Sequence, residues 1–398
     1  MVGYSPYGGQ TYAAYHAHQN PAGSSCGSAV AVDLGLALAA IGTDTGGSIT
    51  FPADRNNIVA IKPTVGLVSR HLVIPASEHR DTVGPMARTV RDAAQLLQVL
   101  AGPDPADNYT SAIPAGRVPD YAAAAAAGSD ALRGARIGVP FNYLGLSEDV
   151  DSWDPSRHEL VAPFRDALRL LQAAGAAVVE ANLTRPDPDR QPANSTFTRD
   201  EQTTLGADLG VGLAAYLSQL TENPAGVWTL ADLRERTQAE PAEENDIWGT
   251  SVWDDALDLG FDNTDARFWA AHQRLLKAQG PDGLLGALER QNLTAVALPA
   301  AAAPWTVNLV GAPVVTVPMG FYPPGTNVTE YETEKNQTVV YWGPGVPFGL
   351  SFVGRPWSEP DLIGLAYGYE QRTRTRTKSR PRTMVPKAEL AMSASCRA

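Results

Sequence analysis

PAGSSCGS at residues 21–28 and GTDTGGSI at residues 42–49 are the two most unusual segments of this sequence. Neither has the GxxxxGK[ST] spacing of a P-loop, and no GxGxxG motif follows a predicted strand. In the second segment, Thr45, Gly46 and Gly47 precede Ser48, and two adjacent glycines allow main-chain N–H groups to turn toward one point beside a hydroxyl. Most Gly-Gly-Ser sequences form ordinary turns with no catalytic role. A catalytic site is therefore indicated only by the two segments together.

Outside these segments, apolar strands alternate with helices along the chain. Apolar side chains recur at helical spacing over residues 158–173, and Thr89 begins another helix in a capping pattern with Asp92. Strands are predicted at residues 58–61, 135–140, 177–179, 313–318 and 348–353, and further helices at 93–100, 267–279 and 361–371. This alternation predicts an α/β fold, a single large domain with a mixed β-sheet core flanked by helices.

The predicted domain covers residues 1–398 and contains three distinctive regions. Residues 21–94 carry the core motif. The polar, acidic and tryptophan-bearing stretch from about 184 to 265 is predicted to be a divergent insertion. The tail from about 372 to 398 alternates Arg with Thr and Pro, and we expect it to be solvated. The Pro- and Ala-rich stretch 108–129 is predicted to be a connector.

Composition excludes several classes of function. The 398 residues contain 31 Lys and Arg against 43 Asp and Glu, and the net charge of −12 argues against nucleic acid as the main partner. Two cysteines are too few for a disulfide scaffold or a multi-cysteine metal site, and the six histidines form no HExxH motif, so no metal site is predicted. The longest apolar run, residues 29–41, contains Asp33 and is too short for a membrane span.

The sequence does not determine the cellular compartment of the protein. The first residues have neither the basic nor the apolar region of a signal peptide. Six Asn-x-Ser/Thr sequons nevertheless occur, at Asn108, Asn182, Asn194, Asn292, Asn327 and Asn336. A secretory ancestry and a Thr-rich composition explain them about equally well. Cys26 and Cys396 can pair only if the C-terminal tail folds back, and the oligomeric state is not predicted.

Taken together, the two Ser-rich segments and their surroundings resemble the amidase signature family of serine hydrolases. The likeness runs from Gly23 through Pro52 and covers most of the chain outside 184–265. It continues through IKPTVGLVSR at 61–70 and DTVGPMARTVRDAA at 81–94, and then through RIGVP at 136–140, GAPVVTVP at 311–318 and GVPFGLSFVGRP at 345–356.

This resemblance implies a serine amidase with a Ser–cis-Ser–Lys triad. By motif position, Ser48 is the acylated nucleophile, and Ser24 is the bridging serine after a cis peptide bond. The N–H groups of Thr45, Gly46, Gly47 and Ser48 are the implied oxyanion hole. A small-molecule amide is the implied substrate, and neither a metal nor an organic cofactor is expected.

Three departures from the family pattern matter. The family's catalytic lysine lies upstream of the bridging serine, but every lysine of this chain follows Ser24: Lys62, Lys277, Lys335, Lys378 and Lys387. We therefore expect the N-terminal segment that carries the general base to be missing, and expect Lys62 to be structural. Thr50 stands where the family commonly has arginine, which favours a neutral substrate. Cys26 replaces a glycine, and an inert buried thiol is the expectation.

Three functions remain open from the sequence. The first is an active amidase, the second is a catalytically impaired homologue without the base, and the third is a subunit that transfers ammonia in a larger assembly. Asp44 is predicted to brace the second turn by accepting main-chain N–H bonds. His71 and His79 lack the GxSxG context of a Ser-His-Asp triad and are predicted to be ordinary loop or surface residues. Trp228, Trp248, Trp253 and Trp269 either line an acyl pocket or pack the insertion.

Overall fold

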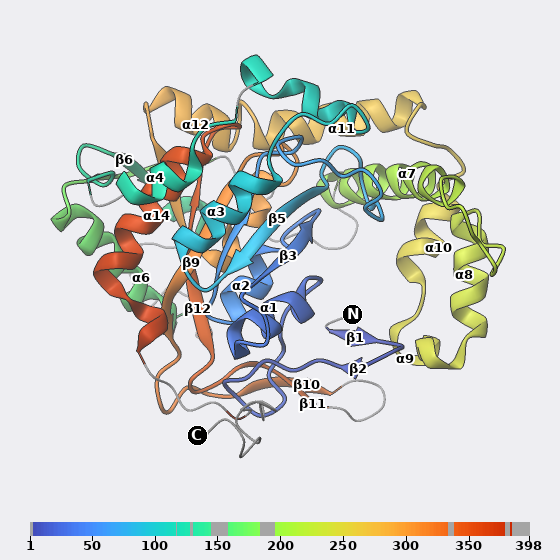
Figure 1. The fold of residues 1–398 in the computed structure, drawn as a ribbon, viewed down its shortest axis with the longest axis horizontal. Helices are drawn as coiled ribbons and strands as arrows, with labels where there is room; N and C mark the ends of the chain where they lie inside the picture. The colour runs from blue at the N-terminus through green and yellow to red at the C-terminus, as the bar shows by residue number, and fades with distance from the viewer. Residues whose placement is uncertain are drawn as a thin grey trace, which may run out of the picture.

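The protein is built around one eight-stranded sheet, seen in a computed structural model that describes residues 3–116, 118–127, 130–144, 158–183, 196–332, 338–378 and 383. The strand order is β3-β5-β4-β9-β12-β8-β6-β7 (Figure 1). In chain order the strands are β3 (Ala39–Asp44), β4 (Val59–Lys62), β5 (Thr82–Ala87), β6 (Arg136–Val139), β7 (Ala177–Glu180), β8 (Ala295–Pro299), β9 (Val314–Phe321) and β12 (Pro347–Val353).

The sheet is mixed, as predicted. Pairing is antiparallel from β3 through β5, β4, β9 and β12 to β8, whereas β6 pairs in parallel with both β8 and β7. Every residue of β4, β5 and β12 is buried, which explains why these strands are mostly apolar and show no regular alternation of polar and apolar residues. Two small hairpins pair β1 (Tyr4–Ser5) with β2 (Gly9–Gln10) and β10 (Thr329–Glu332) with β11 (Thr338–Trp342).

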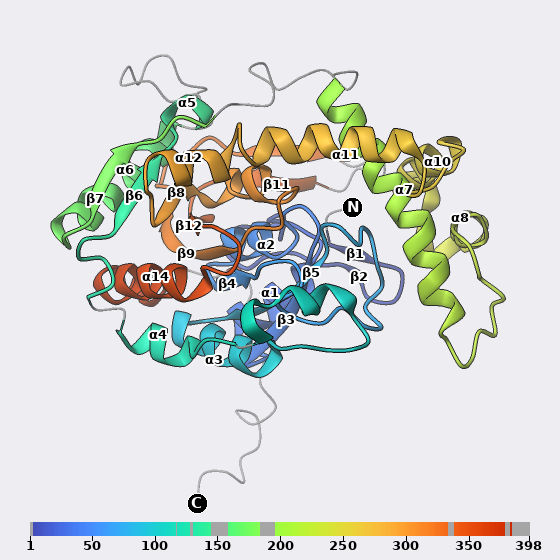
Figure 2. The ribbon, with the colours of Figure 1, turned by 90° about the horizontal axis from the view of Figure 1, so that it is seen from above.

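Helices cover both faces of the sheet. Figure 2 shows α3 (Val90–Leu100), α4 (Tyr121–Ala127) and α14 (Glu359–Thr373) on one side, with α11 (Ala266–Gln279) and α12 (Leu284–Arg290) on the other. The remaining helices of the α/β core are α1 (Cys26–Leu34), α2 (Thr50–Arg55), α5 (Phe141–Leu144), α6 (His158–Ala173) and α13 (Pro304–Val307). The Thr89 side chain accepts the N–H of Asp92, which confirms the predicted cap of α3.

A second group of helices lies at one end of the molecule. These are α7 (Thr196–Ser218), α8 (Leu230–Ala239), α9 (Asn245–Trp248) and α10 (Ser251–Asp258), which stand apart from the sheet in Figure 1; Figure 2 shows the same for α7, α8 and α10. Their small apolar cluster contains Leu213, Leu217 and Leu230, with Trp253 packed against it. Trp248 stacks on Tyr4 at a ring-centroid distance of 5.5 Å. Trp253 thus packs these helices together, and Trp248 packs α9 against β1.

Two expectations about irregular regions were wrong. The alanine run inside 108–129 is not only a connector, because it forms α4 against α3 and α14; alanine is the strongest helix former. The start of the basic tail is attached to the domain, since Arg376 pairs with Asp33 at 2.9 Å and is shielded from solvent. Beyond it, Thr383 donates its N–H to the Ala14 carbonyl. Other positions after 378, including Cys396, lie outside the described residues.

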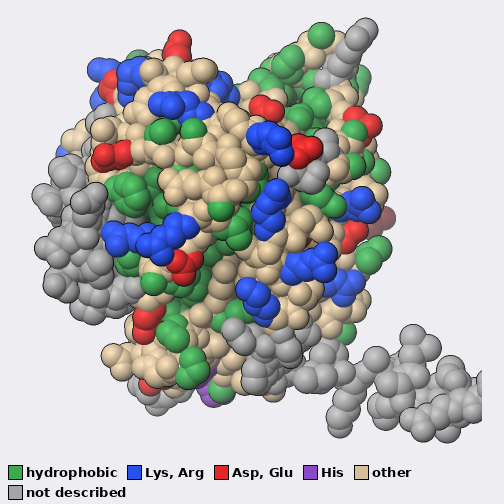
Figure 3. All heavy atoms as spheres, turned by 90° about the vertical axis from the view of Figure 1, so that its left-hand side faces the viewer, with side chains coloured by type: hydrophobic (Ala, Val, Ile, Leu, Met, Phe, Trp, Pro, Cys, Tyr) green, Lys and Arg blue, Asp and Glu red, His purple; other side chains and the backbone are tan. Residues whose placement is uncertain are grey.

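The surface is uneven in charge although the chain is acidic. On the face that carries α14, basic side chains are the more prominent charged groups (Figure 3). The asparagines of four sequons, Asn108, Asn182, Asn292 and Asn327, are exposed, whereas Asn194 and Asn336 fall outside the described residues. Within the described part of the chain, no helix is both long and apolar enough to cross a bilayer.

Candidate active site

Two turns carrying serines meet beside the edge strand β3. Ser24 lies just before α1, and Ser48 lies between β3 and α2. The N–H of Ser25 donates to the Ser48 carbonyl at 3.1 Å. The Ser25 hydroxyl also bonds both the N–H and the carbonyl of Thr43, each at 3.1 Å. These main-chain contacts hold the first turn against the second, and the Gly23–Ser24 peptide bond is cis.

Asp44 braces the second turn, as predicted. Its carboxylate accepts the N–H of Gly47 on one oxygen and the N–H of Ile49 on the other, both at 2.7 Å. Burial raises the pKa of Asp44, while the positive charge of Lys62 and the main-chain N–H bonds act against that rise. The two bonds enclose Ser48 between them, so one buried side chain sets the shape of the turn.

The bond from Gly47 to Asp44 changes the set of N–H groups that can face a substrate. Since the Gly47 N–H is already engaged, the candidate donors are those of Thr45, Gly46 and Ser48, for which no described residue supplies an acceptor. Gly47 adopts a φ of +116° and its α-carbon lies against the Phe51 ring. A side chain there would clash, so glycine is required for the shape of the turn.

The hydroxyls of Ser24 and Ser48 are not engaged in side-chain hydrogen bonds with any described residue, including each other. Ser24 is exposed and Ser48 is partly exposed. Both hydroxyls are therefore available to an incoming molecule. The turn that carries Ser48 also leaves the N–H groups of Thr45, Gly46 and Ser48 without an acceptor among the described residues.

Asp81 is a site residue that the sequence analysis missed. Its carboxylate accepts the Thr45 hydroxyl at 2.6 Å and the N–H groups of Ala76 and Ser77 at 2.8 and 2.9 Å. Burial raises the pKa of Asp81. The available signal was its place at the start of the 81–94 motif, but the sequence does not show that Asp81 reaches back to the turn before Ser48.

Lys62 is buried and bound to the main chain. Its Nζ donates to the carbonyls of Pro63 and Ala312 at 3.2 and 2.9 Å. Burial lowers its pKa to about 8, against the opposing charges of Asp44 and Glu359. These contacts are those of a structural residue, in agreement with the expectation from sequence.

The two other departures from the family pattern are both buried. The Thr50 hydroxyl donates to the Gly47 carbonyl at 3.3 Å, so Thr50 supports the turn and presents no charge. Cys26 is a free buried cysteine in the first turn of α1, and burial raises the pKa of its thiol. A raised thiol pKa disfavours the reactive thiolate, which supports the expectation of an inert thiol.

The histidines do not join the serine turns. His79 bonds Asp208 of α7 through Nδ1 at 2.9 Å, and Ser77 and Asn263 donate to the same carboxylate. His79 is partly buried, so it is a loop residue with a structural partner and not a surface residue. Glu78, His79 and Asp208 offer atoms within 4.8 Å of one another that could hold a metal ion. The existing hydrogen bonds already account for this cluster.

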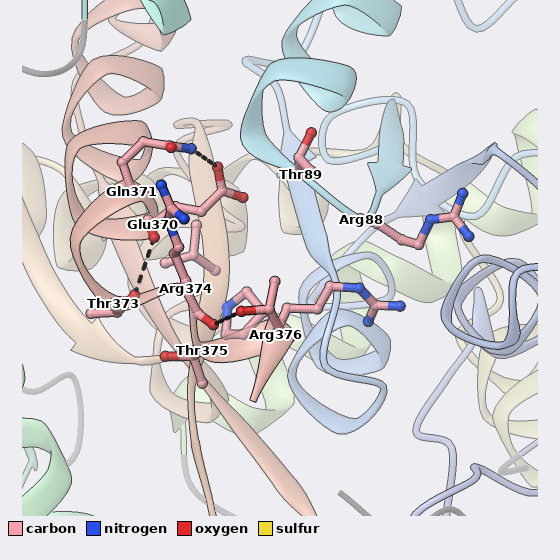
Figure 4. Close-up of a pocket in the computed structure, with 11 residues that line it drawn as sticks. Arg88, Thr89, Glu370, Gln371, Thr373, Arg374, Thr375 and Arg376 are labelled. Atoms are coloured by element: carbon pink, nitrogen blue, oxygen red, sulfur yellow. Dashed lines mark hydrogen bonds between the residues drawn. The ribbon is translucent and has the colours of Figure 1, made fainter. Parts of the chain in front are cut away.

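A cavity of about 450 Å³ lies elsewhere, between β9, the start of α3 and the end of α14. Figure 4 shows that the Arg88 and Arg376 side chains extend away from those of Arg374 and Glu370. The Arg376 guanidinium is already paired with Asp33, and Glu370 accepts the Val90 N–H. Because the charged groups do not converge, we assign no ligand to this cavity.

The chain belongs to the Amidase family, which its residues 1–235 match. A putative amidase of Arthroderma benhamiae is 47% identical over 388 residues, 98% of this chain and 62% of that protein. A glutamyl-tRNA(Gln) amidotransferase subunit of Cereibacter sphaeroides is 32% identical over 377 residues, 88% of this chain and 67% of that protein. The X-ray structure of native peptide amidase from Stenotrophomonas maltophilia has a TM-score of 0.76 and 35% identity, covering 97% of this chain and 72% of that one.

These similarities confirm the amidase family and the α/β fold with a large mixed sheet. The chain spans less than two thirds of the length of the Arthroderma amidase.

Proposed function

We propose that the chain is a serine amidase that hydrolyses a carbon–nitrogen amide bond through an acyl-enzyme on Ser48. The observation that carries this proposal is the bond from the Ser25 N–H to the Ser48 carbonyl, which joins the two serine turns. A serine hydroxyl becomes an effective nucleophile when a neighbouring group takes its proton. In this proposal the neighbour is the hydroxyl of Ser24.

The proposed reaction has two steps. Ser48 Oγ attacks the amide carbon and passes its proton to Ser24 Oγ, while the Ser24 hydroxyl gives its own proton to the leaving nitrogen. The carbonyl electron pair moves onto oxygen, where the N–H groups of Thr45, Gly46 and Ser48 stabilise it. The carbon–nitrogen bond then breaks and releases ammonia or an amine. Water repeats the attack on the Ser48 ester, which releases the acid and restores the serine.

The general base is the role for which we propose no residue. The family resemblance puts a lysine before the bridging serine, and no lysine precedes Ser24 here. Lys62 is committed to the carbonyls of Pro63 and Ala312. The engagement of Lys62 in these two bonds, which keeps it from acting as the base, supports a second candidate function, that of a catalytically impaired amidase homologue. Upstream coding sequence, in frame and bearing a lysine on an apolar strand, would favour the active enzyme.

The substrate we propose is a neutral amide. Thr50 occupies the position at which the family commonly has an arginine, and its side chain is buried against the turn. No cation is thus available from that position to receive a carboxylate. The similarity to the Cereibacter amidotransferase supports a third candidate, an ammonia-releasing subunit of an assembly, which would be seen as activity that depends on a partner protein.

Ammonia release from a panel of neutral primary amides tests the proposal. Wild type and Ser48→Ala are compared at matched concentrations, with folding checked by circular dichroism. We expect release by wild type and none by Ser48→Ala. Release that persists in Ser48→Ala would overturn the role of Ser48, whereas a folded but inert wild type would favour the impaired homologue.

We also propose that the exposed sequons are glycosylated when the chain passes through a secretory pathway. Asn108, Asn182, Asn292 and Asn327 are all exposed, so the fold has room for a bulky surface glycan at each of them. Expression in a secreting host followed by peptide-N-glycosidase treatment should lower the apparent mass. No change in mass of the secreted chain would refute this proposal.

A further inference from the structure

An aromatic ring lies directly against the turn that carries Ser48. Phe51, in the first turn of α2, donates its N–H to the Gly47 carbonyl at 2.8 Å. Its ring is so close that a β-carbon built on Gly47 would lie 2.3 Å from Phe51 Cε2. The position of the Phe51 ring is therefore set by the same turn that presents the nucleophile, and the ring is still partly exposed.

A second aromatic ring extends this surface. Trp305, in α13, lies with its ring centroid 6.2 Å from that of Phe51 at an interplanar angle of 53°, and 43% of the residue is exposed. Burying an apolar ring is favourable by about 25 cal/mol per Å² of apolar surface. A large exposed indole next to the Phe51 ring, which itself lies against the turn of Ser48, is a surface to which an apolar group can bind.

A buried glutamine holds the main chain of Trp305 in position. Gln279 of α11 donates through Nε2 to the Trp305 carbonyl at 2.9 Å and to Asn308 Oδ1 at 2.6 Å, and it accepts the Leu309 N–H at 2.8 Å. Asn308 in turn faces Gly46, where a β-carbon would lie 3.7 Å from Asn308 Nδ2. The residues of α13 and the turn before Ser48 therefore face each other.

Glu201 and Arg80, two charged groups linked to this surface through Asn308, are already engaged with other residues. The Asn308 side chain also bonds Glu201, whose pKa burial raises and the charge of Arg80 lowers. Arg80 is itself buried and bonded to the Thr204 hydroxyl. A charged group bound between the rings would lose its hydration, and neither Glu201 nor Arg80 is free to compensate that loss. An uncharged apolar group has no charge to dehydrate and would not incur this cost.

We infer that Phe51 and Trp305 form the subsite for the acyl side chain of the substrate, and that they select amides with an aromatic or large apolar acyl group over small ones. This inference rests on the proposed function, because the acyl group enters the subsite only when its carbonyl carbon lies at Ser48. It names the substrate class that the proposed function left open.

Binding to an inactive chain tests the subsite independently of turnover. The probes are 3-phenylpropionamide and propionamide, titrated calorimetrically into Ser48→Ala. We expect 3-phenylpropionamide to bind more tightly, by about tenfold to hundredfold, which is the range for burying a large apolar group in a binding site. Equal binding of the two amides, or no detectable binding of the aromatic one, would overturn the inference.

Substitutions at Trp305 test whether this residue causes the preference for the aromatic amide. In the Ser48→Ala background, Trp305→Ala should reduce the preference for 3-phenylpropionamide over propionamide at least several-fold. Trp305→Phe keeps an aromatic ring and should largely keep the preference, so the two variants distinguish a lost aromatic contact from misfolding. Trp228→Ala is the matched control, because Trp228 is similarly exposed at 49% and lies before α8 in the separate group of helices. A preference that is unaffected by Trp305→Ala, or that falls equally in Trp228→Ala, would contradict the subsite.

The active chain distinguishes the two proposals. If hydrolysis depends on Ser48 but the ratio of kcat/KM for the two amides is the same in wild type and Trp305→Ala, only the subsite is wrong. If hydrolysis does not depend on Ser48, the proposed function is wrong. A preference that shifts in binding with Trp305→Ala supports the subsite even where the chain lacks turnover.

Discussion

The Ser25 N–H donates to the Ser48 carbonyl across 3.1 Å, and this bond joins the turn before α1 to the turn before α2. Both atoms belong to the main chain, so the contact does not depend on the side chain of Ser24 or Ser48. Substituting either hydroxyl should therefore leave the two turns in place. Alanine variants at these positions consequently test chemistry more than folding.

Replacing Ser24 tests the proposed proton relay. Ser24→Ala should lower kcat by roughly 10²–10⁴-fold, the usual contribution of a positioned acid or base, and change KM little because the turn is held by main-chain bonds. Steady-state kinetics measures both. Ser28→Ala is the control, since the Ser28 hydroxyl donates to the Ile41 carbonyl at 2.9 Å, away from the turn of Ser48. Unchanged turnover in Ser24→Ala would remove Ser24 from the mechanism.

Replacing Asp81 tests how the N–H groups of the second turn are positioned. Asp81→Asn retains one acceptor oxygen where three donors bind, and we expect kcat to fall roughly tenfold to hundredfold with a smaller change in KM. Thr45→Val should act through the same contact, so the double variant should lose less than the sum of the two single effects.

Asp104→Asn is the matched control for Asp81→Asn. Asp104 accepts bonds from Ser69 and Ala106 and has no contact with Thr45. Additive losses in the double variant, or an equal loss of kcat in Asp104→Asn, would show that Asp81 acts on the fold in general and not on the turn.

The burial of Lys62 predicts how the free energy of unfolding changes with pH. Its folded pKa of about 8 lies below the ordinary value of 10.5, so unfolding takes up a proton between these two values and stability rises with pH in that window. From pH 7.5 to 9.5 the free energy of unfolding should rise by about 2 kcal/mol relative to Lys62→Met. Urea titrations of both chains measure the difference, and a difference that stays constant or shrinks would contradict the burial of a titrating Lys62.

Two glycines should respond oppositely to substitution by alanine. A β-carbon on Gly84 of β5 would lie 2.1 Å from the Ile61 carbonyl oxygen, so Gly84→Ala should destabilise the fold by several kcal/mol through overpacking. Gly210 of α7 has open space at that position, and Gly210→Ala should be neutral or stabilising by up to about 1 kcal/mol. Thermal unfolding of the two variants measures this, and equal effects would contradict the packing of β5.

Elements that depend on short-range patterns were predictable from the sequence. The helical periodicity of 158–173 coincides with the bounds of α6, and Thr89 caps α3 as its spacing with Asp92 indicates. The buried strands of the mixed sheet follow from continuous apolar runs. Asp44 was predictable too, because the N–H groups that it accepts are only three and five residues away.

Contacts between distant segments were not predictable. Asp81 reaches Thr45 across 36 residues, and Trp305 reaches Phe51 from a different part of the chain. No local pattern encodes such pairs, since they depend on how the strands are ordered in the sheet. The alanine run of α4 was missed because its composition resembles that of a connector. The ion pair between Arg376 and Asp33 was missed because it depends on the path of the tail along the surface of the domain.

Mapping a covalent label tests the central claim most directly. The full chain is treated with a fluorophosphonate, digested, and the modified residue is located by mass spectrometry. The account predicts a single adduct on Ser48, absent in Ser48→Ala and slower to form in Ser24→Ala. An adduct on another residue, or labelling that persists in Ser48→Ala, would contradict it.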